Sequence, residues 1–219
     1  MSDDVRPARR WPLVVLAVLA AAAVAFAIGR FSTFGSGASG PNDADAGFAR
    51  DMQVHHAQAV EMAMELYRKT GDDELRTLAY DIATAQSAQK GEMFDWLVQW
   101  GLPQSGAPLM SWMTDAGSGH AGHTGADGGP ATDADLRVAM GMATDAELAD
   151  LRAAVGRDAD CLFLELMIRH HEGAIPMAEA VVGLGSVPRV RAVAEGMIAN
   201  QTAEIDAMTS AQERLGCAG

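Results

Sequence analysis

Two pairs of adjacent histidines, each flanked by methionines, are the part of this chain best suited to chemistry. A thioether is a soft ligand and an imidazole a borderline one, so together they favour copper, above all Cu(I) over Cu(II), with Ag(I) as a mimic. Thioethers also suit an oxidising compartment, where free thiols tend to become disulfides. The candidate metal ligands are Met52, His55, His56, Met62, Met167, His170, His171 and Met177.

These residues occur twice because the sequence that holds them is repeated. Both copies have the pattern F-x3-M-x2-H-H-x2-A-[VI]-x-M-A, beginning at Phe48 and at Phe163, which gives an offset of 163 − 48 = 115 residues. The same offset aligns residues 82–93 with residues 197–208 without a gap. A repeat of this length indicates a duplicated supersecondary unit, here a pair of helices.

Apolar residues recur at alternating spacings of three and four along both copies, which is typical of one buried face of a helix. Short links make the two helices of each copy antiparallel neighbours, so the predicted fold class is all-α: a ferritin-like four-helix bundle built from two duplicated hairpins. Pro176 falls inside a helix and leaves the Glu172 carbonyl unpaired, so we expect a kink there. The long helices are predicted from Asn42 or Asp43 to about Thr70, Asp72 or Asp73 to Trp100, Asp158 onward, and Pro188 to Leu215; a shorter one runs from Thr144 to about Val155, ended by Gly156.

Consecutive residues point about 100° apart on a helix, so only one histidine of each pair can face the bundle axis. The apolar seam assigns this position to His55 and His170. His56 and His171 then flank the axis, where they could bind metal in a groove between helices or make hydrogen bonds that orient the ligands. Further residues that could bind metal or support the ligands are Gln86, Gln89, Met93, Met197, Gln201, Glu204, Met208, His120 and His123.

The same residues also have purely structural interpretations. Methionine at helical spacing usually fills a core, and buried imidazoles can form hydrogen bonds with one another instead of binding metal. A ferritin-like di-iron site needs Glu-x-x-His on two helices, and no glutamate lies three residues before a histidine here. No Ser/His/Asp set, phosphate-binding loop or thiol active site is present, so we expect a protein that is not an enzyme, with a metal-dependent redox enzyme as a remote alternative.

The N-terminal segment indicates export. Three arginines precede an apolar run at 13–28, which is typical of a secretory signal or a signal anchor. We expect residues 11–31 to anchor the chain in a membrane with the N-terminus inside; cleavage after Ala27 would make the protein secreted. Residues 1–30 carry a net charge of +2, so the remainder carries −13 − 2 = −15. A domain this acidic repels nucleic acid and attracts cations.

The expected organisation is residues 1–30 as signal anchor or signal peptide, 31–42 as a flexible linker, and 43–217 as the bundle. Within the bundle, repeat 1 covers 43–101, a loop with a short helix covers 102–156, and repeat 2 covers 157–217. Residues 104–132 are rich in Gly, Ala, Ser and Asp and are predicted to be a surface loop. Cys161 and Cys217 lie at adjacent ends of the second hairpin, so an exported chain should join them in a disulfide; two free thiols are the alternative.

The two His-His motifs, with Met140-Gly141-Met142 between them, resemble the bacterial family called domain of unknown function 305. The resemblance covers roughly residues 43–215. It implies a ferritin-like helical bundle that is usually exported, and copper binding in some members at the periplasm or cell surface. We therefore expect a copper-binding protein that buffers copper, confers resistance or passes the metal to a partner or a second copy. The alternative is a structural or interaction module with a buried histidine network.

Overall fold

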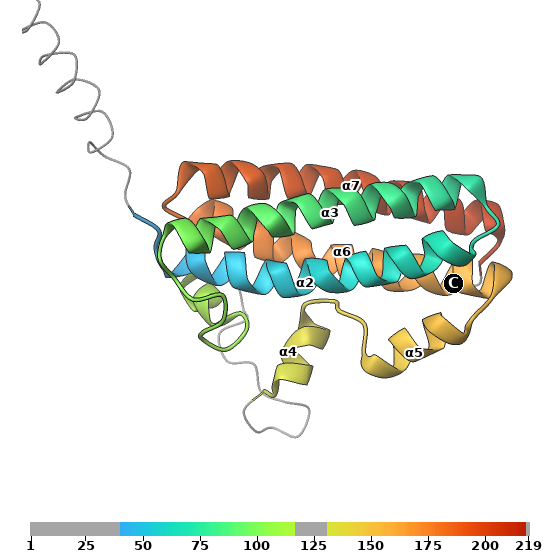
Figure 1. Ribbon diagram of the computed structural model, residues 1–219, viewed down its shortest axis with the longest axis horizontal. Helices are drawn as coiled ribbons and strands as arrows, with labels where there is room; N and C mark the ends of the chain where they lie inside the picture. The colour runs from blue at the N-terminus through green and yellow to red at the C-terminus, as the bar shows by residue number, and fades with distance from the viewer. Residues whose placement is uncertain (1–39, 117–130, 218–219) are drawn as a thin grey trace, which may run out of the picture. The chain divides into compact units, whose positions relative to one another are not determined.

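Four long helices form the bundle in this computed structural model, which describes residues 40–116 and 131–217. They pack as two antiparallel hairpins, α2 with α3 and α6 with α7, and the hairpins meet mainly along α2 and α6 (Figure 1). The expected all-α four-helix bundle is confirmed. The elements are α2 (Asp43–Lys69), α3 (Asp73–Gln99), the 3-10 helix η1 (Ser111–Ala116), α4 (Asp133–Ala139), α5 (Asp145–Ala153), α6 (Gly156–Leu184) and α7 (Pro188–Leu215).

Local sequence sets the helix starts where the pattern predicted them. Asn42 begins α2 with a capping box, in which its side chain accepts from the Asp45 backbone N–H and the Asp45 carboxylate accepts from the Asn42 N–H. Asp72 caps α3, and Thr144 begins α5 with a second capping box. Each cap satisfies backbone N–H groups that the first helical turn leaves unpaired.

Side chains at both ends of the bundle hold the two hairpins in register. At one end the buried Asp45 carboxylate of α2 accepts hydrogen bonds from Ser186 and from the Val187 N–H, and so holds the residues just before α7, which begins at Pro188. At the other end Arg214 of α7 donates to the Asp72 carboxylate at 2.6 Å. These contacts fix how far α2 and α3 slide along α6 and α7, and so fix which residues meet in the middle.

The predicted disulfide is confirmed. Cys161 at the start of α6 is bonded to Cys217 after the end of α7, with 5.4 Å between their Cα atoms. The bond closes the open end of the second hairpin, where Arg157 of α6 also donates a hydrogen bond to the Gly216 carbonyl just past α7.

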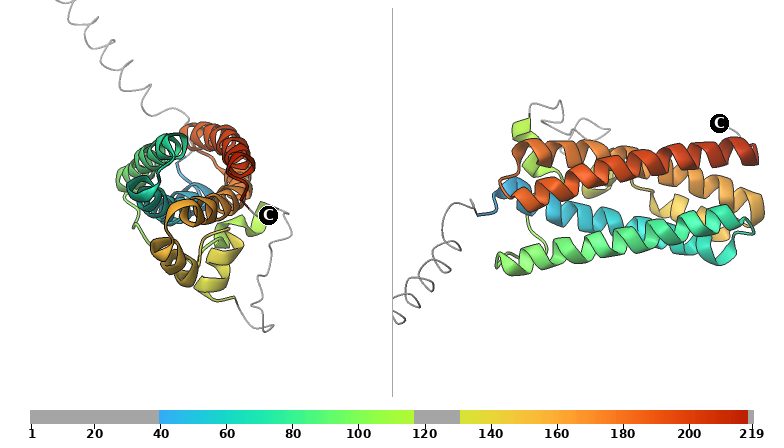
Figure 2. Two further views of the ribbon diagram at one scale, coloured as in Figure 1. Left: turned by 90° about the vertical axis from the view of Figure 1, so that its right-hand side faces the viewer. Right: turned by 90° about the horizontal axis from the view of Figure 1, so that it is seen from above.

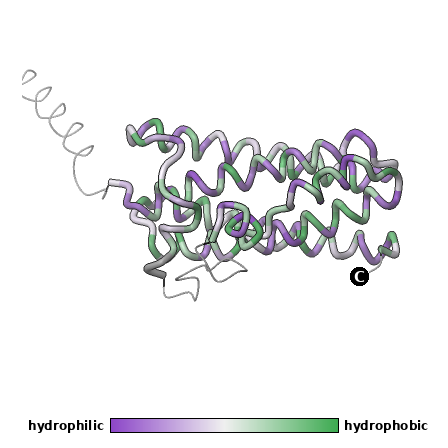
Figure 3. The backbone as a smooth tube through the Cα atoms, turned by 90° about the horizontal axis from the view of Figure 1, so that it is seen from below, coloured by the Kyte–Doolittle hydropathy of each residue, from purple (hydrophilic) through white to green (hydrophobic). Residues whose placement is uncertain are grey.

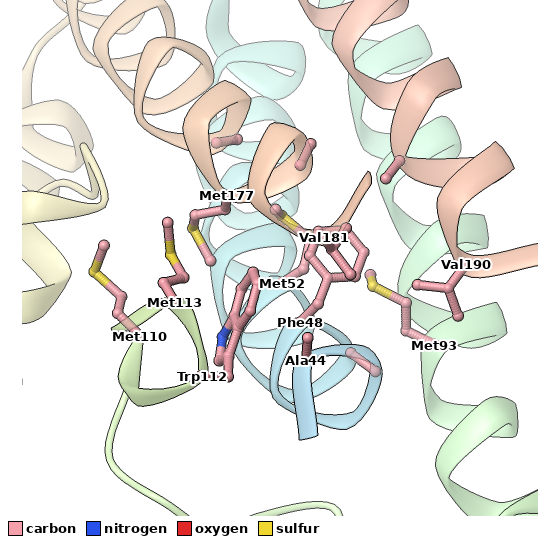
Figure 4. Close-up of a cluster of buried hydrophobic side chains, with 14 of the residues drawn as sticks. Ala44, Phe48, Met52, Met93, Met110, Trp112, Met113, Met177, Val181 and Val190 are labelled. Carbon is pink, nitrogen blue, oxygen red and sulfur yellow. The ribbon is translucent and has the colours of Figure 1, made fainter. Parts of the chain in front are cut away.

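Buried side chains separate into two clusters along the bundle. Hydrophobic and hydrophilic residues alternate along the helices, as expected when one face of each is buried (Figure 3). The Met52 cluster, at the α2 N-terminus, includes Ala44, Phe48, Met52, Met93, Trp96, Leu97, Met110, Trp112, Met113, Met140, Met142, Met177, Val181, Val190 and Met197 (Figure 4). The Met167 cluster, at the α2 C-terminus, includes Met62, Leu66, Leu75, Ile82, Phe163, Met167 and Met208.

In the connection between the hairpins, residues 104–116, most of the described part of the predicted surface loop, include a buried segment. Trp112 and Met113 of η1 are buried, because Asp51 of α2 accepts hydrogen bonds from the Met110 N–H at 2.7 Å and from Trp112 Nε1–H at 2.8 Å. A Cβ on Gly47 would lie 2.3 Å from the Trp112 ring, so that glycine gives the indole its place. Helices α4 and α5 continue the connection on the outside of the bundle, beside α2 and α6 (Figure 2).

Two predictions concern helix α6, one its start and the other its course past Pro176. Helix α5 ends at Ala153 and α6 already begins at Gly156, so Gly156 starts the long helix instead of ending the short one. Helix α6 continues without a break through Pro176; a kink at that position stays a prediction.

The predicted N-terminal anchor (residues 11–31) and the loop histidines His120 and His123 lie outside the described residues. None of the helices within 40–116 and 131–217 combines the length and the apolar character that crossing a membrane requires.

Candidate metal centre

All four histidines of the repeated motif are completely buried in the middle of the bundle. His55 of α2 and His170 of α6 face each other across the hairpin interface, with ring centroids 3.6 Å apart and planes tilted by 33°. This is the axial position that the seam assigned to them. The imidazoles lie between the two clusters, because Met52 precedes His55 by one turn and belongs to one cluster, whereas Met62 follows it and belongs to the other.

The second histidine of each pair points into the groove of its own hairpin. His56 Nε2 lies 2.8 Å from Gln89 Oε1 on α3, and His171 Nε2 lies 2.6 Å from Glu204 Oε2 on α7. The two contacts are equivalent under the repeat, since 204 − 89 = 115. Gln89 and Glu204 were predicted as supporting residues, and they hold the rings as such partners do.

These contacts fix which ring nitrogen carries the proton. His55 Nε2 lies 3.0 Å from the Met140 carbonyl oxygen, and carbonyl and carboxylate oxygens accept hydrogen bonds only. His55, His56 and His171 therefore carry their protons on Nε2, which leaves a lone pair on each Nδ1. Within the described residues, the nitrogens without a hydrogen-bond partner are Nδ1 of all four rings and Nε2 of His170.

Burial keeps the rings of His55, His56 and His170 neutral near pH 7. Desolvation lowers the pKa of His55 to about 3 and the pKa of His56 to about 4, and it lowers the pKa of His170 well below the ordinary value. Neighbouring imidazoles lower all three further, because two adjacent positive charges would repel each other. A neutral imidazole is the form that binds a metal ion, so the lone pairs are available without loss of a proton.

A strap of the connection, Met140–Ala143, closes one side of the histidine layer. Its Gly141 and the facing Gly173 of α6 allow the two backbones to touch: a Cβ on Gly173 would lie 2.0 Å from the Met140 carbonyl oxygen. Gln58 of α2 clamps the end of the strap, accepting from the Ala143 N–H at 2.7 Å and donating to its carbonyl at 2.8 Å. The strap thereby holds the carbonyl that orients His55.

An ion pair holds α5, the helix that follows the strap, against α6. Arg169, next to His170, donates two hydrogen bonds of 2.8 Å to the Glu147 carboxylate of α5. Arg169 holds the pKa of Glu147 at about 2, so the carboxylate stays ionised. The geometry is bidentate, which is the strongest arrangement for this pair.

The strap occurs once whereas the helices that it contacts are repeated, so the two repeats differ in sequence where they meet it. Gln58 and Gly173 are equivalent positions, since 173 − 58 = 115. Gln58 forms hydrogen bonds with the strap, and Gly173 has no side chain that would clash with the strap backbone. Sequence reasoning missed Gln58, Gly173 and the strap; the break in the repeat at this position was the one available signal.

The eight predicted ligands are all fully buried, but the structure does not gather them at one point. Met52 and Met177 lie on one side of the imidazoles with Met93 and Met197, and Met62 and Met167 lie on the other with Met208. Gln86 and Gln201 are buried too, and both have amide atoms without a partner among the described residues. In that part of the chain no three His, Cys, Asp or Glu side chains are grouped as a metal site.

Known proteins share this fold. The family described as "Domain of unknown function (DUF305)" matches residues 45–212. A DUF305 protein from Streptomyces coelicolor, thought to be secreted, is 39% identical, with a TM-score of 0.67 over 80% of this chain and 94% of that one. A DUF305 fragment from Deinococcus radiodurans is 28% identical, with a TM-score of 0.65 over 80% and 99%. CopM in its Cu(I)-bound form is 25% identical, with a TM-score of 0.56 over 78% and 96%. No curated protein matches the chain.

Proposed function

Because this chain belongs to the DUF305 family, whose description states no activity, we propose a function from the site itself: an exported copper-binding protein, with Cu(I) favoured over Cu(II). Its role is to buffer copper, to confer resistance or to transfer the metal. The ligands are drawn from the four imidazoles and the flanking thioethers, namely Met52, His55, His56, Met62, Met167, His170, His171 and Met177.

The observation that carries this proposal is the set of buried imidazole nitrogens without a partner in the described part of the chain. A buried polar atom left unpaired costs about 1–3 kcal/mol, and a hydrogen-bonded network would have paired these atoms. The Nε2–H groups of His55, His56 and His171 are already engaged, which leaves each Nδ1 lone pair for another partner. A metal ion accepts such lone pairs without needing a donated proton.

The surroundings favour a soft, weakly charged ion. The thioethers and the imidazoles of His55, His56 and His170 are neutral, and burying a divalent ion among neutral ligands is more costly than burying a monovalent one. Sulfur on both sides of the imidazoles adds preference for Cu(I). CopM, a 25% identical structure, was solved with Cu(I) and with Ag and also with Cu(II), which supports copper as the metal here but does not choose its oxidation state.

Binding and transfer fit the burial better than catalysis does. The four rings are completely shielded from solvent, so a bare ion could be accommodated among them whereas an organic substrate could not. We propose that the protein is not an enzyme. We also propose that residues 11–31 tether the domain outside the cytoplasm, either at the cell surface or in a periplasm; export is supported by the likeness to the Streptomyces protein thought to be secreted.

The test is a Cu(I) titration in competition with a chromophoric chelator, on the full chain and on the double variant His55→Ala, His170→Ala. We expect the variant to lose the Cu(I) bound at the histidine centre while its helical circular dichroism is kept. The matched control, His120→Ala with His123→Ala, removes the same number of imidazoles from outside the described residues and should keep the buried site loaded. Undiminished binding by the first variant would refute the proposal.

The alternative function is a structural module, in which the His55–His170 stack and the contacts to Gln89 and Glu204 serve only to hold the hairpins together. In that case copper leaves the melting temperature unchanged, and the His55→Ala, His170→Ala variant is strongly destabilised. Thermal melts of both proteins with and without Cu(I) separate the two functions.

A further inference from the structure

A small hollow inside the bundle is lined by residues of α2, α6 and α7, and none of the four imidazoles is among them. Its lining includes Met52, Met197 and the amide residue Gln201, and three small or aliphatic residues of α6 with Ile198 complete it. Met52 is fully buried, Met197 is 1% exposed and Gln201 is 4% exposed. The hollow is therefore part of the interior and has no polar lining other than this amide.

The amide oxygen of Gln201 has no hydrogen-bond partner among the described residues. Water is the usual partner of a buried carbonyl oxygen, but this hollow is too small to admit a water molecule. A bare ion is smaller than a water molecule, and it can be held by sulfur atoms that move on flexible side chains. Two thioethers with one neutral oxygen are a set suited to a soft monovalent ion.

The repeat shows that only one half of the bundle has this arrangement. Subtracting 115 converts Met197 to position 82 and Gln201 to position 86, and adding 115 converts Met52 to position 167. The other half therefore has Met167 and Gln86 at the equivalent places, but Ile82 in place of the second thioether. Met197 lies in the Met52 cluster and Ile82 in the Met167 cluster, so the two trios are at opposite sides of the histidine layer.

We propose that Met52, Met197 and Gln201 form a separate site for a soft monovalent cation, Cu(I) or Ag(I), that is present in one half of the bundle and lacking in the other. The identity of the metal rests on the copper function proposed above; the sulfur site itself does not require the imidazoles. The protein is then asymmetric in its metal content although its histidine pairs are duplicated. A cation entering from the Met-rich end would meet this thioether site beside the imidazoles.

The natural asymmetry supplies reciprocal variants. Met197→Ile places an isoleucine with Met52 and Gln201, as Ile82 already stands with Met167 and Gln86. Ile82→Met places a second methionine with Met167 and Gln86. Both changes exchange apolar side chains of similar volume, which cores tolerate at a cost below about 1.5 kcal/mol. Ag(I) is the probe, because it does not change oxidation state, and native mass spectrometry of the full chain counts the bound ions.

We expect Met197→Ile to bind one Ag(I) fewer than the parent and Ile82→Met to bind one more. In the parent, with methionine methyl groups labelled with ¹³C, Ag(I) should shift the signals of Met52 and Met197 together. An unchanged Ag(I) count in Met197→Ile, or a Met52 signal that Ag(I) does not move, would overturn the proposal. If Met197→Ile fails to fold, the parent spectrum and Ile82→Met decide the question.

The outcomes also separate this site from the histidine centre. The His55→Ala, His170→Ala variant should still show the paired shifts of Met52 and Met197. Loss of copper only in the histidine variant would support the proposed function and refute this site. Paired methionine shifts, together with normal copper binding in the histidine variant, would support this site and refute the proposed function.

Discussion

The hydrogen-bond partners of His56 and His171 differ in charge although their positions are equivalent. His171 Nε2–H is held by the Glu204 carboxylate at 2.6 Å, and His56 Nε2–H is held by the Gln89 amide oxygen at 2.8 Å. A carboxylate partner raises the basicity of the other ring nitrogen more than an amide does. The Glu204→Gln variant makes the second pair like the first, and Gln89→Glu makes the first like the second.

The size of the effect follows from this contact. Loss of an outer partner of a ligating histidine typically weakens metal binding by about 10–100-fold. Here the hydrogen bond is kept and only its charge is removed, and Glu204 is partly open to solvent, with 22% of its side chain exposed. A charged hydrogen bond is about twice as strong as a neutral one, a difference of about 1–1.5 kcal/mol, so we expect about tenfold weaker Cu(I) binding at His170 and His171.

The assay is competition between the protein and a chromophoric Cu(I) chelator at fixed pH, with helicity checked by circular dichroism. Gln89→Glu should tighten binding at the other pair by a similar factor. Glu195→Gln is the matched control, because it removes the same charge from an exposed position of α7. Equal affinities of Glu204→Gln and Glu195→Gln would refute the reasoning, since the effect would then be one of net charge and not of the contact with His171.

Three further results concern stability and the strap. The Cys161→Ala, Cys217→Ala variant frees two residues 56 apart in sequence, which should lower the free energy of unfolding in urea by about 4 kcal/mol; an unchanged midpoint would contradict this. Burial lowers the pKa of His55 to about 3, so the contribution of the neutral ring to stability is complete above the unfolded pKa of about 6.5 and is lost as the pH falls towards 3. The metal-free protein should therefore melt at a lower temperature at pH 5 than at pH 7, and equal melting temperatures would disprove this. Gly173→Ala would place a Cβ 2.0 Å from a strap carbonyl, so it should cost about 1–3 kcal/mol of stability in thermal melts and weaken Cu(I) binding. Gly183→Ala, in open space on the same helix, should instead stabilise the protein by about 0.5–1 kcal/mol. Similar effects of the two variants would argue against the close approach of Gly173 to the strap.

The bundle could be predicted because each local signal agreed with the others. The constant offset of the motifs indicated two hairpins, the spacing of Phe48, Met52 and His55 gave the buried face, and the caps at Asn42 and Thr144 gave the starts. The same pattern placed His55 and His170 on the bundle axis, and the antiparallel hairpin brought Cys161 and Cys217 together. Such agreement between levels is what makes a sequence foldable.

The connection could not be predicted because its contacts are specific and long-range. Composition marks residues 104–132 as a loop, yet the carboxylate of Asp51 draws Trp112 into the interior. The carbonyl that orients His55 belongs to Met140, 85 residues away, and a backbone atom leaves no trace in residue type. Only the difference between Gln58 and Gly173 hinted that the two repeats meet something that is not repeated.

The central claim is that neutral imidazole nitrogens and thioether sulfurs in the bundle interior bind Cu(I). X-ray absorption at the copper K-edge, measured on the full chain loaded with Cu(I), tests it most directly. The account predicts nitrogen and sulfur scatterers together around the metal, with the nitrogen component lost in the His55→Ala, His170→Ala variant. A spectrum with neither sulfur scatterers nor the outer-shell scattering of imidazole rings, or one that the variant leaves unchanged, would contradict it.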